Sequence, residues 1–382
     1  MVAIGTMPGI ASQQNCARPR IRECTFNDHE QIADLTERSG LEAERFEHWR
    51  DLWLTNSAYR KAGSGWPIGW VLEDPRKKLV GYLGNIPLRY LFRGRELVAA
   101  TSRTWVVEKT YRAYAPLLLD LHFSQRDVDL FVHPTVNADA YAAYRTFAVR
   151  PVPVGAWDRA IFWITRYVGS MQALLRSKRV PCAAALSYPG AAVLYLKDKV
   201  AGRRLAAHSD IEFEECESFD ERFDTFWNEL KSQSKDLLLA VRSREALQWH
   251  FHYALAQQRA SVIVIGQRPR IAGYAIFFRN DNRELGLTRL RLVDFQVLTD
   301  RERTLRAALA WGVEKCRQEG IHVLEVIGFR PYGSTLIEEL APYSRRLPRW
   351  LYFYKAKEAA LARELADPAV WNPCGFDGDA SL

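Results

Sequence analysis

The sequence predicts an α+β protein with two tandem domains, each built on a mixed, mostly antiparallel sheet flanked by helices. Its 382 residues are enough for two domains with separate cores. In the first half, β-rich segments separated by turn residues form a meander between helical segments. The same order of elements recurs in the second half, where Gly273-Tyr274 follows Gly81-Tyr82 by 273 − 81, or 192, positions. Internal duplication is the simplest interpretation.

The first domain is expected at residues 20–156, after a flexible leader over residues 1–19. A strand at 21–26 leads into a helix that Gly40 ends, and an aromatic amphipathic helix follows at 46–53. The meander that comes next is predicted to contain strands at 69–72, 79–83, 88–92 and 97–107.

Residues 128–149 carry the most specific pattern in the chain. An apolar strand is stopped by His133-Pro134, because a proline cannot donate to a strand ladder. Asn137 then fits the N-cap of a helix that carries Tyr144 on its apolar face.

The spacing of Asn137, Ala140, Tyr144 and a closing Ala148-Val149 resembles the Asn-x-x-Ala-x-x-x-Tyr…Gly-Phe signature of the GCN5-related N-acyltransferases. In that family the signature lies on the fifth strand and the helix after it. Its tyrosine often protonates the thiolate leaving group of coenzyme A, so the resemblance implies that role for Tyr144. Here Ala148-Val149 replaces the closing Gly-Phe. The alternative interpretation of Tyr144 is a core residue with a satisfied hydroxyl.

The resemblance also implies a coenzyme A site after the fourth strand, where the family carries Arg/Gln-x-x-Gly-x-Gly/Ala. Backbone amides of that loop, at a helix N-terminus, bind the pyrophosphate. Arg112 fits the first position, whereas alanine and leucine stand where glycines are frequent, and Pro116 removes one amide donor. The expected cofactor-binding residues are Val107, Arg112, Ala113, Tyr114, Ala115, Leu117, Leu118 and Asn137.

The resemblance leaves the general base to be found. The family often uses a glutamate on the fourth strand; Glu108 ends that strand here, and His133 closes the fifth. The catalytic candidates are therefore Tyr144, Glu108 and His133. For Glu108 and His133 the alternative is a solvated loop residue.

Residues 157–207 are expected to join the two domains. Within them, 157–178 are predicted to form a basic amphipathic helix and 181–190 a linker. Such a helix can pack across a domain junction or lie on a membrane surface, and the junction is the preferred interpretation. The second domain is placed at 208–356, and the tail at 357–382 is predicted to begin as a helix and end as a mostly exposed acidic strip.

The second copy lacks the cofactor signals. Residues 298–305 stand where the phosphate loop should be, but they contain no glycine, and Asp300 and Glu302 would oppose a pyrophosphate. The second copy is therefore expected to be structural or to help shape the acceptor site.

Composition narrows the classes of function. The chain has 53 basic and 45 acidic residues, a net charge of +8, which favours polyanionic partners such as coenzyme A without selecting among them. Binding to DNA is not expected. The six cysteines are scattered, so no metal site is predicted. No secretory signal and no apolar run of membrane-spanning length is present, which predicts a cytoplasmic protein.

Together these features predict an N-acyltransferase that uses acetyl-CoA or another acyl-CoA and lets an amine attack the thioester directly. The acceptor is expected to be a small-molecule or sugar-type amine. The first alternative is a FemABX-like transferase, because those enzymes also have tandem copies of the fold whose cofactor loops have lost the usual residues. They use aminoacyl-tRNA in place of coenzyme A. The second is a catalytically silent acyl-CoA-binding or scaffold protein. The sequence assigns no oligomeric state.

Overall fold

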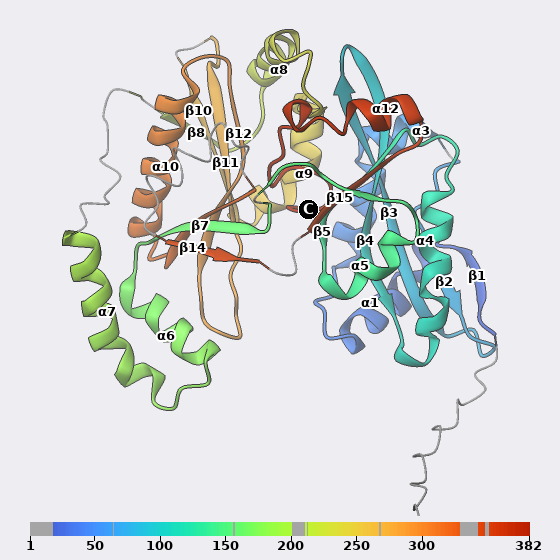
Figure 1. The fold of residues 1–382 in the computed structure, drawn as a ribbon, viewed down its shortest axis with the longest axis horizontal. Helices are drawn as coiled ribbons and strands as arrows, with labels where there is room; N and C mark the ends of the chain where they lie inside the picture. The colour runs from blue at the N-terminus through green and yellow to red at the C-terminus, as the bar shows by residue number, and fades with distance from the viewer. Residues whose placement is uncertain are drawn as a thin grey trace, which may run out of the picture.

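The computed structural model describes residues 18–63, 65–155, 157–200, 211, 213–266, 269–328, 343–347 and 351–382. These residues form two sheets, one in each half of the molecule, with helices on both faces (Figure 1). The predicted α+β class with two mixed sheets is confirmed. The expected leader falls mostly on residues 1–17, which lie outside the described residues.

The first sheet contains, in spatial order, β1 (Arg20–Glu23), β2 (Gly69–Glu73), β3 (Leu79–Phe92), β4 (Arg95–Val107), β5 (Leu130–Val136), β15 (Leu351–Ala356) and β6 (Arg150–Pro151), with β9 (Leu239–Ala240) paired to β3. The predicted strands at 79–83 and 88–92 are one strand, β3. Pro87 does not break it, because pairing with β2 ends at Gly84, and the Pro87 carbonyl instead accepts a hydrogen bond from Asn56.

The second sheet contains, in spatial order, β14 (Tyr343–Arg346), β7 (Arg159–Ile164), β13 (Val323–Ile327), β12 (Arg289–Val297), β11 (Gly273–Arg279), β10 (Ala260–Ile265) and β8 (Phe213–Cys216). Each sheet has a parallel pair at the equivalent place, β4 with β5 and β12 with β13, between antiparallel neighbours. The two halves thus repeat one topology, as the duplication predicts.

The two sheets exchange strands. The late strand β15 lies in the first sheet beside β5, and β7 lies in the second sheet between β13 and β14. The prediction of a helix from residue 157 was therefore wrong over 159–164, where Ala160, Ile161 and Trp163 are buried in the second sheet. The exchange ties the halves together, and one core cluster draws residues from both.

The described helices are α1 (His29–Arg38), α2 (Phe46–Leu54), α3 (Ser57–Ala62), α4 (Ala115–Phe123), α5 (Ala138–Arg145), α6 (Tyr167–Ser177), α7 (Ala183–Val200), α8 (Glu221–Gln233), α9 (Arg244–Ala256), α10 (Arg301–Gln318) and α12 (Ala359–Glu364). Helices α4 and α5 pack on one face of the first sheet, and α1 and α2 pack on the other. On the second sheet, α10 covers one face and α8 and α9 the other. None of the described helices is long and apolar enough to cross a bilayer.

Helices α6 and α7 form a hairpin at the outer end of the second sheet, away from the junction between the halves (Figure 1). The predicted packing of the halves through this helix was wrong, because β7 turns the chain outward before α6 begins. The predicted linker at 181–190 is also largely helical, since α7 starts at Ala183 and contains Pro189.

The end of the tail, from Val370 onward, is mostly buried, and the prediction of an exposed acidic strip was wrong. Trp371, Cys374 and Phe376 are each at most 6% exposed and join the core cluster shared by both halves. The end of the chain consequently lies between the two halves (Figure 1). This burial places acidic side chains of the tail inside the molecule.

Candidate active site

The candidate site lies where β4 and β5 stop pairing with each other, and we use the word cleft for this fork between the two strands. In the described structure these parallel strands pair at Ala99–Leu130 and Ala100–Phe131, and no later pair follows. On β5 beyond that point, the carbonyl of Pro134 accepts a hydrogen bond from the Trp157 indole at 2.8 Å. Beyond the last pair, backbone groups of the two strands no longer pair with each other, so they can meet a side chain or a ligand.

A bulge in β4 sets which side chains face this cleft. Thr104 has a φ of 54°, and the register with β3 shifts between Tyr82 and Gly84 opposite it. Because a bulge adds a residue, it breaks the alternation of side chains, and Ser102 and Trp105 both reach the Tyr144 side of the sheet.

Three polar side chains meet on that side. The Ser102 hydroxyl lies 2.8 Å from the Tyr144 hydroxyl and 3.0 Å from His133 Nδ1. The rings of His133 and Tyr144 are 5.0 Å apart at 77°, which is an edge-to-face contact. Ser102 therefore joins the ends of β5 and α5 into one hydrogen-bonded chain, which we call the serine–histidine–tyrosine cluster.

Burial sets the protonation of this cluster. It lowers the pKa of His133 well below its ordinary value, with a smaller contribution from His122, so the imidazole is neutral. The backbone N–H of Ser102 points at Nδ1 at 3.5 Å, which favours the tautomer with its proton on Nε2. Burial likewise raises the pKa of Tyr144, so its phenol keeps its proton at neutral pH. The cluster offers O–H and N–H donors to a ligand.

Several buried polar atoms near the cluster have no hydrogen-bond partner among the described residues. They include Trp105 Nε1, His133 Nε2, Thr101 Oγ1 and both ring nitrogens of His122. Buried polar groups are almost always paired in folded proteins, so a group of unpaired ones indicates a place for a ligand or ordered water. Burial also lowers the pKa of His122 to about 3.

A charged group lies on the opposite face of β4. The Arg103 guanidinium donates from Nε to Glu44 Oε1 at 3.0 Å, while Glu44 Oε2 is buried without a partner among the described residues. Burial opposes ionisation of Glu44, but Arg103 and His48 outweigh it and lower its pKa. This carboxylate faces the side on which α1 and α2 pack.

The buried tail brings a second carboxylate into the cleft. Asp379 Oδ1 accepts a hydrogen bond from the Thr135 hydroxyl of β5 at 2.9 Å. Burial raises the pKa of Asp379, although Arg103 opposes the shift. The preceding Gly378 has a φ of 59°, and a Cβ there would lie 2.5 Å from Pro134 Cδ. Only glycine lets the tail approach the strand this closely.

The second half holds the tail in place. Buried Arg242 donates to Asp294 at 2.9 Å and to the Cys374 sulfur at 3.1 Å. His250 Nε2 lies 2.8 Å from the Ser381 hydroxyl. These contacts fix both ends of the segment that carries Asp379, so the second half completes a site whose other residues belong to the first.

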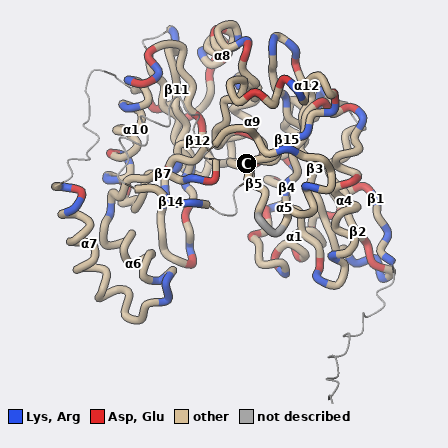
Figure 2. Tube along the Cα trace, viewed as in Figure 1, with Lys and Arg blue, Asp and Glu red and all other residues tan. Residues whose placement is uncertain are grey.

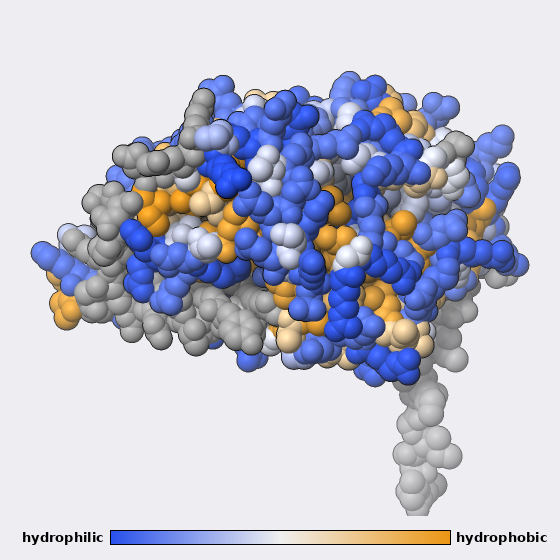
Figure 3. All heavy atoms as spheres, turned by 90° about the horizontal axis from the view of Figure 1, so that it is seen from above, coloured by the Kyte–Doolittle hydropathy of each residue, from blue (hydrophilic) through white to orange (hydrophobic). Residues whose placement is uncertain are grey.

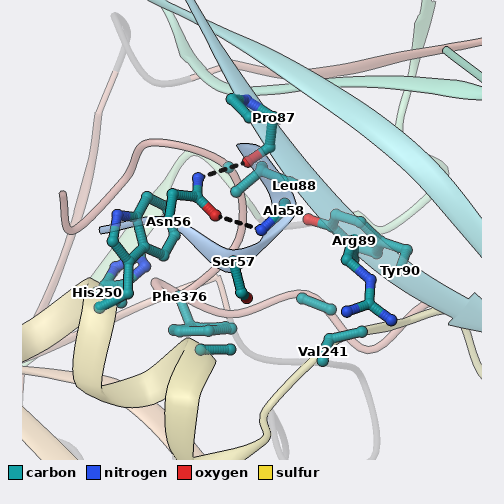
Figure 4. A pocket seen from close by; sticks show the side chains of 14 residues that line it. Asn56, Ser57, Ala58, Pro87, Leu88, Arg89, Tyr90, Val241, His250 and Phe376 are labelled. Carbon is teal, nitrogen blue, oxygen red and sulfur yellow. Dashed lines mark hydrogen bonds between the residues drawn. The ribbon is translucent and has the colours of Figure 1, made fainter. Parts of the chain in front are cut away.

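A small pocket lies between the halves on the far side of Gly378. It has a volume of about 30 Å³, enough for roughly one water molecule. Figure 4 shows Asn56 bridging Pro87 and Ala58 on one wall, with His250 and Phe376 on the other. The pocket is too small to hold a substrate in this conformation.

The expected cofactor-binding residues lie together at the β4-to-α4 turn, except Asn137. Arg112 and Ala113 are exposed in the 3-10 helix η2 (Lys109–Tyr114), which runs directly into α4. Around them Tyr114 and Ala115 are half-buried, and Leu118 is buried in the core. Asn137 caps α5 as predicted, because its Oδ1 accepts from the Ala140 amide at 2.8 Å. The remaining members are Val107, which ends β4, and the exposed Leu117.

The catalytic candidates separate into two places. His133 and Tyr144 meet through Ser102, whereas Glu108 follows the far end of β4. The Glu108 carboxylate pairs with Arg38 and, at 3.1 Å, with Lys78. Burial opposes its ionisation, yet hydrogen bonds from these two cations lower its pKa, which makes it a weak base.

Comparison with known proteins identifies the fold. No family model and no curated protein sequence matches the chain. A GCN5-related N-acetyltransferase from Anabaena variabilis superposes with a TM-score of 0.52 and 13% identity over 89% of this chain and 73% of its own. The chain has the GCN5-related N-acyltransferase fold. N-myristoyltransferase from Saccharomyces cerevisiae, solved with myristoyl-CoA, superposes with a TM-score of 0.57 and 13% identity. The match covers 94% of this chain and 85% of that chain. A probable N-acyltransferase from Enterococcus faecalis superposes with a TM-score of 0.54 and 11% identity over 89% of this chain and 72% of that chain.

Within this N-acyltransferase fold, sequence reasoning missed Ser102, Arg103 and Asp379. The alternation of β4 would place Ser102 on one face and Arg103 on the other, so a signal for them existed. For Asp379 the signal was the apolar content of the tail, since Trp371 and Phe376 are unusual in an exposed strip. Among the described residues, no three His, Cys, Asp or Glu side chains are placed to hold a metal ion.

Proposed function

We propose that the protein is an acyl-CoA-dependent N-acyltransferase whose transfer centre is the cleft between β4 and β5. The observation that carries this proposal is the serine–histidine–tyrosine cluster on one face of the cleft with Asp379 entering from the tail. The fold likeness to N-acetyl- and N-myristoyltransferases supports the same class of reaction.

The donor substrate would enter on the side of α4 and α5. The exposed turn around Arg112 and Ala113 offers backbone amides at the start of α4 and one cationic side chain to a pyrophosphate. The thioester would then reach the cleft beside Tyr144.

The acceptor would approach from the side of α1 and α2. Glu44 Oε2 and Asp379 present carboxylate oxygens there, which favours an amine that arrives as an ammonium ion. A small-molecule amine fits this chemistry.

Asp379, Tyr144 and solvent can carry out the proton transfers that the acyl transfer needs. Asp379, whose pKa is raised by burial, takes one proton from the ammonium ion, which frees the nitrogen lone pair to attack the thioester carbonyl. The nitrogen loses its second proton to solvent as the amide forms. The carbon–sulfur bond breaks and the thiolate leaves. The pKa of Tyr144 is raised above that of an ordinary thiol, roughly 8.5, so the phenol stabilises the thiolate by donating a hydrogen bond, and solvent supplies the proton.

The direct test compares Asp379→Asn with Asp377→Asn. Asparagine still accepts the Thr135 hydrogen bond but cannot take a proton, so Asp379→Asn should lower kcat about 10²–10⁴-fold and remove the acidic limb of the pH–rate profile. Asp377 is buried in the same tail but contacts Tyr90 and the Cys374 amide, so Asp377→Asn should keep kcat. Product formation is followed by mass spectrometry with acetyl-CoA and longer acyl-CoAs. Equal rates for the two variants would exclude Asp379 as the base.

A further inference from the structure

A second and larger cavity lies in the other half of the molecule. It has a volume of about 310 Å³ and is enclosed by the α6–α7 hairpin, the loop before β12 and the strands β7, β13 and β14. This volume is ten times that of the pocket between the halves, and it lies at the lower end of the range for small-molecule sites, roughly 300–1,000 Å³.

The walls of the cavity are mostly hydrocarbon. They come from both helices, from the sheet and from the loop. The apolar lining residues are Phe162, Ile164, Met171, Ala173, Leu174, Leu194, Leu285, Leu287 and Val323. Leu174 is 50% exposed, which shows that the lining reaches the surface of the hairpin.

One side of the cavity is strongly basic. Three guanidinium groups surround the carboxylate of Glu325: Arg291 at 2.8 Å, Arg289 at 3.8 Å, and Arg345. The Glu325 and Arg289 side chains are 1% and 14% exposed, whereas the Arg345 side chain is 41% exposed. Arg289, Arg345 and Glu325 all line the cavity. A buried charge needs a partner, and Glu325 is the carboxylate in contact with both cations that line the cavity, Arg289 and Arg345.

Other charged groups nearby are engaged elsewhere. Asp281 pairs with Arg279 at 2.7 Å and accepts from the Arg289 amide, while Asp198 accepts hydrogen bonds from Tyr343 and Tyr167. Burial lowers the pKa of Arg289; Glu325 opposes this shift, while Arg291 and Arg345 add to it.

The outer surface of the hairpin has the chemistry of a lipid-facing element. Eight of the fourteen large hydrophobic side chains that are exposed among the described residues lie on α6 and α7. Residues 166–200 carry six basic side chains and one acidic side chain. Figure 2 shows basic residues at the ends of the hairpin and long uncharged stretches between them. The face over α8 and α12 is by contrast mostly hydrophilic (Figure 3). Exposed apolar area flanked by lysine and arginine favours anionic lipid.

We propose that this cavity binds an anionic head group carried on a single alkyl chain, with the chain between the hairpin and the sheet and the anion at Arg345 and Arg289. A fatty acid, or one chain of an anionic lipid, has this chemistry. The site is separate from the transfer cleft and does not depend on the proposed acyl transfer.

The first test is calorimetric titration of the full chain with saturated fatty acids from octanoate to tetradecanoate at pH 8. Burial of each methylene should tighten binding about fourfold until the cavity is full, after which the affinity levels off. The matched fatty alcohols lack the charge and should bind at least tenfold more weakly. Equal affinity for acids and alcohols would overturn the role of the arginines.

Two pairs of variants test whether the ligand binds in this cavity. Leu174→Trp fills the mouth of the cavity, while Leu186→Trp adds the same ring at a 48% exposed position of α7 that does not line it. Arg345→Gln removes the accessible cation, while Arg346→Gln changes the next residue of β14, whose side chain does not line the cavity. The first member of each pair should lose at least tenfold in affinity and the second should match the wild type.

The source of the anion is distinguished by vesicle co-sedimentation. Vesicles of phosphatidylcholine with equimolar phosphatidylglycerol should bind the wild type more than phosphatidylcholine alone, with Leu174→Trp weakened, if the ligand is a lipid chain. Binding of free dodecanoate without vesicle binding assigns the site to free fatty acid. If Leu174→Trp and Arg345→Gln bind both probes like the wild type, the cavity is not the site and the proposal fails. Acyl transfer measured on the same variants should be unchanged in every case.

Discussion

Removing the charge of Asp294 should destabilise the protein more than any surface change, because it leaves Arg242 buried without its counter-ion. The two side chains are 0% and 1% exposed. In Asp294→Asn the guanidinium keeps its contacts to the Ala240 carbonyl and the Cys374 sulfur but loses the carboxylate. Breaking a buried pair from one side typically costs about 3–5 kcal/mol. Since Cys374 leads into the tail, the change should also lower acyl-transfer activity.

Equilibrium urea unfolding followed by circular dichroism measures this cost. The matched control is Glu245→Gln, which breaks an ion pair with Arg60 that also joins the halves but whose side chains are 54% and 53% exposed. An exposed pair contributes at most about 1 kcal/mol. If Asp294→Asn and Glu245→Gln lower the free energy of unfolding equally, the buried pair does not hold the tail and the reasoning is refuted.

Three further predictions concern the cleft and the tail. Tyr144→Phe keeps the ring but removes the donor, so kcat should fall about 10²–10³-fold with little change in Tm, while Tyr141→Phe, at a 39% exposed position, should keep full activity. Burial raises the pKa of Asp377 to about 6 from 3.8, so the wild type should lose roughly 2 kcal/mol of stability relative to Asp377→Asn as pH rises from 4 to 6, in chemical unfolding at fixed pH values. A wild type that gains stability over this window would contradict that sign. Gly378→Ala should lower both Tm and kcat, because its Cβ would meet Pro134 Cδ at 2.5 Å; a Tm equal to the wild type would show that the tail can move aside.

Local patterns predicted the elements around the cleft well. Asn137 placed the cap of α5, and the helical spacing placed Tyr144 inward, where it is 3% exposed. These features depend on residues close in sequence. The predicted stop of the strand at His133-Pro134 was wrong, because β5 continues to Val136, which pairs with Leu351 of β15.

The parts that sequence reasoning missed depend on contacts between distant residues. The burial of Asp379 follows from Arg242, Asp294 and His250, which are more than eighty positions away in the chain. The exchange of β7 and β15 likewise depends on pairing with strands of the other half. Periodicity can show that a segment is a strand, but it does not show which sheet the strand joins.

Calorimetric titration of acyl-CoA tests the central claim most directly. Ala115→Asp places a carboxylate in the first turn of α4, where it favours the helix but opposes a pyrophosphate, and Arg301→Asp makes the equivalent change in α10 of the second half. Wild type and Arg301→Asp should bind acetyl-CoA or a longer acyl-CoA equally, and Ala115→Asp should lose at least tenfold in affinity with an unchanged Tm. Binding that survives Ala115→Asp but is lost in Arg301→Asp would contradict a donor site in the first half.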